Sequence, residues 1–187
     1  MVDSAHFQPD DRRVGDQLAD LRVRIDAIDQ QLIALINQRA RLAQAVGEAK
    51  KLDGSPVFRP DREAQVIDRV KAQNPGPVRE DSLAPIWREI MSACRALEAR
   101  QRVAFLGPVG TFSEQAALRY FGSSIDAIAC ANIDEVFRAT VSGSADFGVV
   151  PVENSTEGVV ARSLDLLLQS PLTIIGETSL LVQHNLL

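Results

Sequence analysis

Hydrophobic residues in the first third of the chain recur at helical spacing. From Asp16 to Leu52 there is no proline, and the apolar side chains lie three, four or seven residues apart. These side chains are Leu18, Leu21, Ile25, Ile28, Leu32, Leu35, Leu42 and Val46. The pattern predicts one long amphipathic helix, extending about 50 Å at the usual rise per residue.

A helix of this length exceeds what its own domain can cover. A domain of about 90 residues has a radius of gyration of only about 12 Å. One copy of the chain therefore cannot bury the whole apolar stripe with its remaining residues. The stripe predicts a helical partner, most simply a second copy in a homodimer formed through the long N-terminal helix.

Proline and glycine then set the limits of a second helix. The stretch DGSP at 53–56 interrupts the first helix. Pro60 suits the first turn of a new helix that runs through Gln73, because its fixed backbone angle is already helical. The stretch NPGP at 74–77 ends that helix.

A third helix completes this half of the chain. Asp81 or Ser82 can cap its first turn, and the apolar periodicity continues to about Arg100. We therefore expect an all-α domain of three unequal helices over 16–101. Residues 1–15 are expected to form a disordered polar tail.

After Arg102 the pattern changes to short apolar runs that alternate with amphipathic segments. The expected strands are 103–107, 125–131, 146–154 and 172–184, the last as one strand or a strand pair. The expected helices end at Gly122 and Gly143 and, for the third, cover 158–170. Such alternation predicts an α/β domain with mostly parallel strands over 102–187.

Composition and charge narrow the classes of function. Apolar residues make up 45% of the 187 residues, which is ordinary for a globular protein. Residues 1–101 carry 16 basic and 16 acidic side chains, whereas 102–187 carry 4 and 9, so the second half accounts for the net charge of −5. No basic tract is present, so we expect no nucleic-acid partner. No apolar run approaches the roughly 20 residues of a membrane span, so we expect no membrane partner.

Cysteine and histidine usage suggests neither a metal nor a cofactor. Cys94 and Cys130 form no CxxC pair and no ligand cluster with His6 and His184. A reduced, cytoplasmic setting is the default for such a chain. The N-terminal residues also lack the apolar core of a signal peptide.

Two cations interrupt the apolar stripe of the first helix. Arg39 and Lys50 lie about 20° apart on a helical wheel and about 16 Å apart along the axis, while Arg22 lies at the edge of the stripe. A single lysine or arginine there can extend its charged end to water. Two at the centre are harder to explain in this way, because a buried cation costs several kcal/mol unless it is paired.

Charged residues also occur on the apolar faces of the next two helices. Glu63, with Arg62 at its flank, lies on the face of the second helix, and Glu98 lies on that of the third. One interpretation is an internal network of ion pairs. The other is a polar pocket between helices, suited to a small dianion. Spacing alone favours neither.

Longer stretches resemble a known family. LRVRIDAIDQQLIALINQRARLAQAVGEAKK and PVFRPDREAQV resemble the all-helical chorismate mutase domain. REIMSACRALEARQ followed by RVAFLGPVGTFSEQAA resembles its fusion to a prephenate dehydratase, and PVENSTEGVV resembles the second signature of that dehydratase. The resemblance implies a three-helix, intertwined dimeric mutase domain, followed by part of an α/β lobe similar to periplasmic binding proteins.

The resemblance assigns roles to the charged residues of the first helix. Arg22 matches the arginine that reaches across from the partner chain, and Arg39 matches the one that binds a substrate carboxylate within its own chain. Lys50 matches the lysine that contacts a carboxylate and the ether oxygen whose bond breaks. The helical wheel fits these roles, because Arg22 lies about 100° around the helix from Arg39 and Lys50 and could hardly face the same ligand.

The remaining matches lie in the other two helices. Arg62 and Glu63 match an arginine–glutamate pair whose glutamate takes the substrate hydroxyl. Some relatives have aspartate in place of Arg59 and serine in place of Cys94, so this sequence departs from the pattern at two possible ligands. The position of Glu98 holds glutamine in some relatives and glutamate in others.

The dehydratase resemblance rests on two loops. Thr111, Phe112 and Ser113 follow a glycine loop that opens a helix, and Asn154 and Ser155 belong to the second signature. A plain strand-to-helix turn and a capped turn would explain the same residues. The Thr-Arg-Phe motif of these dehydratases is not found in residues 1–187, so we expect mutase activity without dehydratase activity.

Two further functions stay open. The chain could be a non-catalytic helical dimerisation module with a ligand-binding α/β half, in which case the helix cations would be solvent-exposed ion pairs. It could also be a regulatory protein of the chorismate pathway that binds without turnover.

The side chain at position 98 predicts a pH dependence. A glutamate can donate a hydrogen bond to the ether oxygen only when it is protonated. We therefore expect a mutase rate that declines toward alkaline pH and a flatter profile in Glu98→Gln, measured as chorismate loss against pH. An unchanged profile in that variant would exclude this role for Glu98.

Overall fold

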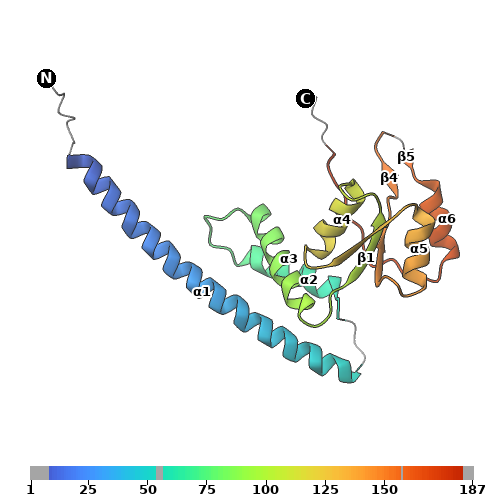
Figure 1. Ribbon diagram of the computed structural model, residues 1–187, viewed down its shortest axis with the longest axis horizontal. Helices are drawn as coiled ribbons and strands as arrows, with labels where there is room; N and C mark the ends of the chain where they lie inside the picture. Colours follow the sequence, from blue (N-terminus) through green and yellow to red (C-terminus); the bar gives the residue numbers. More distant parts are fainter. Residues whose placement is uncertain (1–8, 54–56, 157, 183–187) are drawn as a thin grey trace. The chain divides into compact units, whose positions relative to one another are not determined.

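The computed structural model describes residues 9–53, 57–156 and 158–182 (Figure 1). The chain divides into two compact units, residues 1–42 and 43–187. The described part of the first unit is helical throughout. The second unit holds the remaining helices and all of the strands in the described residues.

The long N-terminal helix is confirmed. Helix α1 runs without interruption over Pro9–Asp53. It begins before Asp16, so part of the stretch expected to be a polar tail is helical, and residues 1–8 lie outside the described residues. Proline suits a first helical turn, which gives this early start a local cause.

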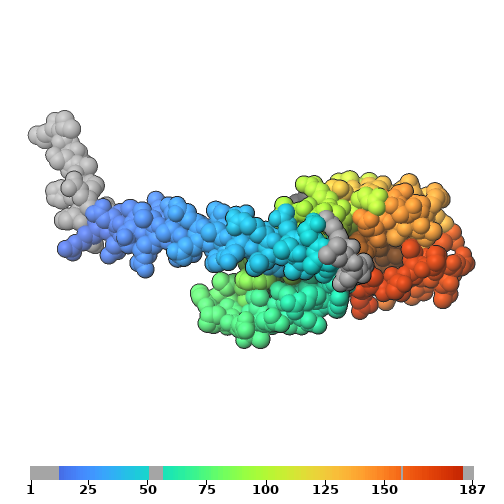
Figure 2. Space-filling view, turned by 90° about the horizontal axis from the view of Figure 1, so that it is seen from below, coloured from blue at the N-terminus to red at the C-terminus, as the bar shows by residue number. Residues whose placement is uncertain are grey.

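The apolar stripe of α1 is exposed along the first unit. Figure 2 shows one face of this stretch, in blue. Leu21, Ile28 and Leu35 are 50%, 55% and 60% exposed. Apolar side chains at helical spacing normally cover a core, yet the described residues leave these side chains about half exposed.

Helix α2 spans Pro60–Ala72, with proline in its first turn as the sequence predicts. Helix α3 spans Glu80–Ala96, so the predicted end at about Arg100 is wrong. The helix tightens instead, with the Leu97 N–H donating to the Cys94 carbonyl and the Glu98 N–H to that of Arg95. The predicted cap is also wrong, because Arg79 precedes the helix and makes no side-chain cap hydrogen bond.

The α/β part of the second unit forms a three-stranded parallel sheet. Strands β1 (Arg102–Leu106), β2 (Asp126–Cys130) and β3 (Phe147–Val149) lie in the order β2-β1-β3. Helix α4 (Phe112–Phe121) connects the first two strands, and α5 (Ile133–Val141) connects β2 to β3. The predicted mostly parallel α/β arrangement is confirmed.

The two helices cover opposite faces of the sheet. Val103 packs with Ala117 and Phe121 of α4, whereas the next residue along β1, Ala104, packs with Val136 of α5. Successive strand residues point to opposite faces, so this division follows from the chain itself. The chain returns past β1 to reach β3, which places its second crossover on the other face.

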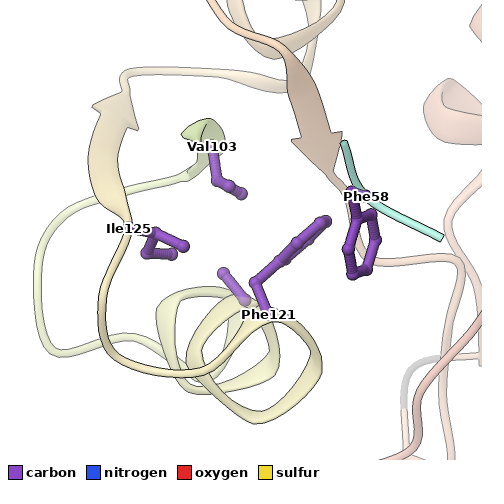
Figure 3. Packing of buried hydrophobic residues seen from close by; sticks show 5 residues of the cluster. Phe58, Val103, Phe121 and Ile125 are labelled. Carbon is purple, nitrogen blue, oxygen red and sulfur yellow. The ribbon is translucent and has the colours of Figure 1, made fainter. Parts of the chain in front are cut away.

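Phe58, which precedes α2, completes the core on the α4 side. Its ring lies 5.0 Å from that of Phe121 and 5.4 Å from that of Phe147, centroid to centroid. Figure 3 shows Phe58 on one side of Phe121, with Val103 and Ile125 on the other. Phe58 is 6% exposed, so the segment that leads into α2 shares one hydrophobic core with α4 and the sheet.

The predicted third strand is only partly observed. After β3, Pro151 lacks the N–H that would continue the ladder. The chain then forms a short antiparallel hairpin of β4 (Glu153–Asn154) and β5 (Gly158–Val159). Helix α6 (Ala161–Gln169) follows and is tied to α5 by a bond from Arg162 Nε to Asp134 Oδ2 of 3.1 Å.

The strand predicted at 172–184 is wrong for the described residues, which end at 182. This stretch has no regular structure, and Ile174 and Leu181 are 68% and 84% exposed. An apolar run becomes a strand only when another strand satisfies its backbone groups. Here the Ile175 carbonyl accepts a hydrogen bond from the Tyr120 hydroxyl instead, at 3.1 Å.

The shared core predicts a large cost for one truncation. We expect Phe58→Ala to lower the free energy of unfolding of the second unit by about 3–5 kcal/mol, because it leaves a cavity beside the rings of Tyr120, Phe121 and Phe147. Urea denaturation of the chain measures this loss. Leu168→Ala is the control, since Leu168 is 86% exposed, and its loss should stay below about 0.5 kcal/mol. Equal losses in the two variants would contradict a shared core.

Candidate functional site

The three cations predicted on the first helix all lie on α1. Arg22 is exposed, whereas Arg39 and Lys50 are half-buried. Because α1 is continuous between Arg39 and Lys50, both side chains leave the same side of the helix. The structure thus keeps the spacing that made these two residues candidates.

Glu98 lies against α1 close to Lys50. Its carboxyl carbon is 2.2 Å from the point where a Cβ atom on Gly47 would stand. Gly47 is buried and precedes Lys50 by three residues, which is nearly one helical turn. The absence of a side chain at position 47 therefore lets the Glu98 carboxylate reach the Lys50 side of α1.

Glu63 is held by an arginine that the sequence interpretation did not select. The half-buried Glu63 Oε1 accepts a hydrogen bond from Nη1 of Arg95, which is 8% exposed. Nη2 of Arg95 donates to the Phe121 carbonyl at 2.5 Å. The guanidinium carbon also lies 4.9 Å from the centre of the Phe58 ring, a distance at which a cation is attracted to an aromatic face.

The helical wheel missed Arg95 because it assumed one covered side of α3. Ile86 and Leu97, which lie on one side of the helix by their spacing, are 47% and 54% exposed. The buried side chains of α3 are Leu83, Met91, Ser92, Cys94 and Arg95. Helix α3 contacts both α2 and α4, so its polar positions next to α4 are covered as well.

Arg59 and Arg62 lie at the outer surface. The Arg59 guanidinium donates two hydrogen bonds to Asp61, of 3.1 and 2.7 Å, and this pairing lowers the pKa of Asp61 to about 2. Arg62 is exposed. Cys94, by contrast, is buried, with 3% of its surface exposed. In the single chain, the structure therefore places Glu63 inward and its neighbouring arginine outward.

The residues of the predicted dehydratase cleft follow two neighbouring strands. Thr111 and Phe112 come after β1, and Asn154 and Ser155 come after β3. The strand order β2-β1-β3 reverses its direction between β1 and β3. In open α/β sheets, ligands bind beyond the carboxyl ends of the strands at such a reversal.

The first of these loops is held by its own hydrogen bonds. Thr111 Oγ1 donates to the Leu106 carbonyl at 3.0 Å and accepts from the Glu114 N–H at 3.4 Å. The Glu114 carboxylate in turn accepts from the Gly110 N–H at 2.5 Å. This reciprocal pattern resembles a capping box, which stabilises the start of α4 whether or not a ligand binds.

Beside this loop lies an open hollow of about 290 Å³. It is lined by Gly110, Thr111, Phe112, Glu114, Gln115 and Leu118. Phe112 is 51% exposed and Ser113 is half-buried. In the second loop, Asn154 Oδ1 accepts from the Thr156 N–H at 2.8 Å, and Ser155 is exposed.

The described ranges contain neither a membrane-spanning helix nor a cluster of metal ligands. No helix there combines the length and apolar character that a membrane crossing needs. No three side chains of the types His, Cys, Asp or Glu gather there as metal ligands. Within the second unit, the candidate residues are Lys50, Glu63 and Glu98 and those of the loops after β1 and β3.

The sequence matches two families in succession. Residues 21–99 match Chorismate mutase type II, and residues 103–187 match Prephenate dehydratase. The bifunctional chorismate mutase/prephenate dehydratase of Stutzerimonas stutzeri is 49% identical over 178 residues, covering 92% of this chain and 49% of that protein. The chain belongs to the bifunctional chorismate mutase/prephenate dehydratase family. The two matches meet near the boundary predicted at residue 101, which stays a prediction.

Other relatives agree in name and extent. The protein of the same name from Pseudomonas aeruginosa is 49% identical over 177 residues, covering 92% of this chain and 48% of its own. The chain thus spans about half the length of the curated relatives it matches. Among solved structures, chorismate mutase (Form II) from Thermus thermophilus is 30% identical, covering 46% of this chain and 97% of its own, with a TM-score of 0.44.

The contact between Gly47 and Glu98 predicts non-additive stability changes. Gly47→Ala should stabilise α1 by about 1 kcal/mol through helix propensity. With Glu98 present the gain should be smaller, because the new methyl group forces the carboxylate to move. In a Glu98→Ala background the full gain should appear, as measured by urea denaturation. An equal gain in both backgrounds would show that Glu98 does not lie against Gly47 in solution.

Proposed function

We propose that this chain is a chorismate mutase that converts chorismate to prephenate by a pericyclic rearrangement. The observation that carries the proposal is the position of the Glu98 carboxylate against Gly47, one turn from Lys50. The family match over residues 21–99 supports the same activity. Substrate binding and turnover by this chain are what the experiment below tests.

The residues proposed for the site suit a reaction without a nucleophile. The substrate is a dianion that rearranges within one molecule, so the protein must hold a compact conformer and stabilise charge on the breaking ether bond. Arg39 is proposed to bind a carboxylate, and Lys50 to contact a carboxylate and the ether oxygen. Glu98 in its protonated form is proposed to donate a hydrogen bond to that oxygen, and the Glu63 carboxylate to accept one from the substrate hydroxyl.

We propose that the site is completed by a second copy of the chain. The exposed apolar stripe on the first unit supports a homodimer, because association would bury side chains that are about half exposed in one copy. Arg22 is on another side of α1 from Arg39 and Lys50, so it is proposed to enter the partner's site. Arg62, exposed in the single chain, is proposed to bind substrate in the dimer.

A ligand-binding site is proposed for the α/β half. The loops after β1 and β3 meet where the strand order reverses, which favours a ligand site there. The family match over residues 103–187 supports prephenate as the ligand and dehydration to phenylpyruvate as the reaction of the family. Thr111, Phe112, Ser113, Asn154 and Ser155 are the residues proposed to line this site.

The pathway and compartment follow from the same family. The two reactions in sequence would contribute to the biosynthesis of phenylalanine. We propose a cytoplasmic location, because the two buried cysteines suit a reducing compartment.

The mutase proposal predicts which cations matter. We expect Lys50→Ala to lower kcat/KM for chorismate by about 100- to 1,000-fold, because it removes a donor to the developing charge. Arg39→Ala should also lower kcat/KM, mainly through substrate binding. Purified chain is mixed with chorismate, its loss is followed, and the product is analysed.

Arg24→Ala is the matched control for this series. Arg24 is on the same helix, but its side chain is 71% exposed and pairs with Asp20 at 3.9 Å. We expect its activity to equal that of the unchanged chain, and the dimer to persist in all three variants. Equal activity of Lys50→Ala and Arg24→Ala would support the alternative of a non-catalytic dimerisation module.

A further inference from the structure

Helix α3 is bound to the segment after α4 by side chains at regular spacing. Glu89, Ser92 and Arg95 follow one another at intervals of three residues along α3. The Ser123 N–H donates to the Glu89 carboxylate at 3.1 Å, and the Ser124 N–H donates to Ser92 Oγ at 3.1 Å. Arg95 donates to the Phe121 carbonyl at 2.5 Å. These contacts place α3 against residues 121–124.

The backbone at Gly122 fits the same contact. Its φ angle of +81° lies in the region that favours glycine, and a Cβ atom there would stand 2.4 Å from Cβ of Ser92. Any larger residue would push α3 away from this segment. The position of α3 relative to α4 is therefore closely defined.

Within this frame, the Arg95 guanidinium has its position set on three sides. Nη2 is bound by the Phe121 carbonyl, the Phe58 ring lies beside the guanidinium, and Nη1 bonds to Glu63. Its side chain is 9% exposed, so solvent contributes little to its placement. A planar guanidinium held in this way leaves few orientations for the carboxylate that it binds.

We propose that Arg95 is a positioning residue for the mutase reaction, which fixes the Glu63 carboxylate for the substrate hydroxyl. The proposal rests on the proposed function, which assigns that hydroxyl to Glu63. A carboxylate has about four acceptor sites, so the bond from Arg95 does not exhaust it. Arg95 itself is surrounded by the protein, and it acts on the substrate through Glu63.

This role differs from that of a merely structural ion pair. A structural pair would stabilise the fold and leave the kinetics of the folded enzyme unchanged. A positioning residue affects the rate, because a displacement of about 1 Å in a reacting geometry can cost about 100-fold. The α/β half supplies Phe121, so it would contribute to the orientation of a mutase side chain.

A double-mutant cycle separates these roles. Arg95→Met keeps the length of the side chain and removes its charge and donors, and Glu63→Gln keeps the shape of the acid. We expect Arg95→Met alone to lower kcat/KM for chorismate by about 10- to 100-fold. In the Glu63→Gln background the same change should cost less than about 2-fold, because the two residues act as one unit.

Two further variants keep the test interpretable. Ser92→Ala removes a neighbouring contact between α3 and the segment after α4 without touching Glu63, and should leave kcat/KM unchanged even if it lowers stability. Arg95→Lys retains the charge but not the planar fork, and should recover part of the lost activity. If Arg95→Met does not fold, the cycle is carried out with Arg95→Lys. Its smaller decrease in kcat/KM should likewise disappear in the Glu63→Gln background.

The outcomes distinguish this inference from the proposed function. An unchanged chain that fails to consume chorismate would overturn the proposed function. Two results in an active chain would overturn the inference alone. One is that Arg95→Met lowers kcat/KM by the same factor with and without the Glu63→Gln change. The other is that Arg95→Met and Ser92→Ala lower kcat/KM equally. An active chain in which Arg95→Met strongly lowers kcat/KM only when Glu63 is present supports both the proposed function and the inference.

Discussion

The second unit depends on one buried cation, the guanidinium of Arg95. Removing such a charge from water costs several kcal/mol unless polar partners replace the solvent. Here the partners come from three separate segments: Glu63 on α2, the Phe121 carbonyl at the end of α4, and the Phe58 ring before α2. Arg95 thus links α3 to each of these segments.

Local patterns in the sequence were sufficient for most elements of the fold. Helical spacing predicts α1, and the apolar runs near residues 103 and 125 predict β1 and β2, because each pattern is complete within a few residues. The strand expected after residue 172 depends on a partner strand, which no local pattern contains. The end of α3 was also missed, since side chains beyond Ala96 continue the apolar period after the backbone has turned.

The candidate site likewise has residues that local sequence patterns reveal and others that only the fold reveals. Arg39 and Lys50 were visible in the sequence because each is a charge within an apolar stripe. Arg95 was not, because its burial comes from α4, a helix that follows it in the chain. The contact of Glu98 with Gly47 joins positions that are distant in the sequence, so only the folded chain shows it. Polar residues buried between elements are thus the part of such a site that periodicity cannot find.

The place of Phe58 has a consequence for how the two halves can be separated. By family, the chain divides between residues 99 and 103, yet this ring belongs to the helical stretch and fills the core beneath β1 and β3. A cut at the family boundary would leave a hole in one fragment and an uncovered aromatic ring in the other. The segment around Phe58 therefore packs in one unit with the α/β half, although the family boundary separates them in sequence. Exchange of either half between relatives would have to bring the segment around residue 58 along with the sheet that it completes.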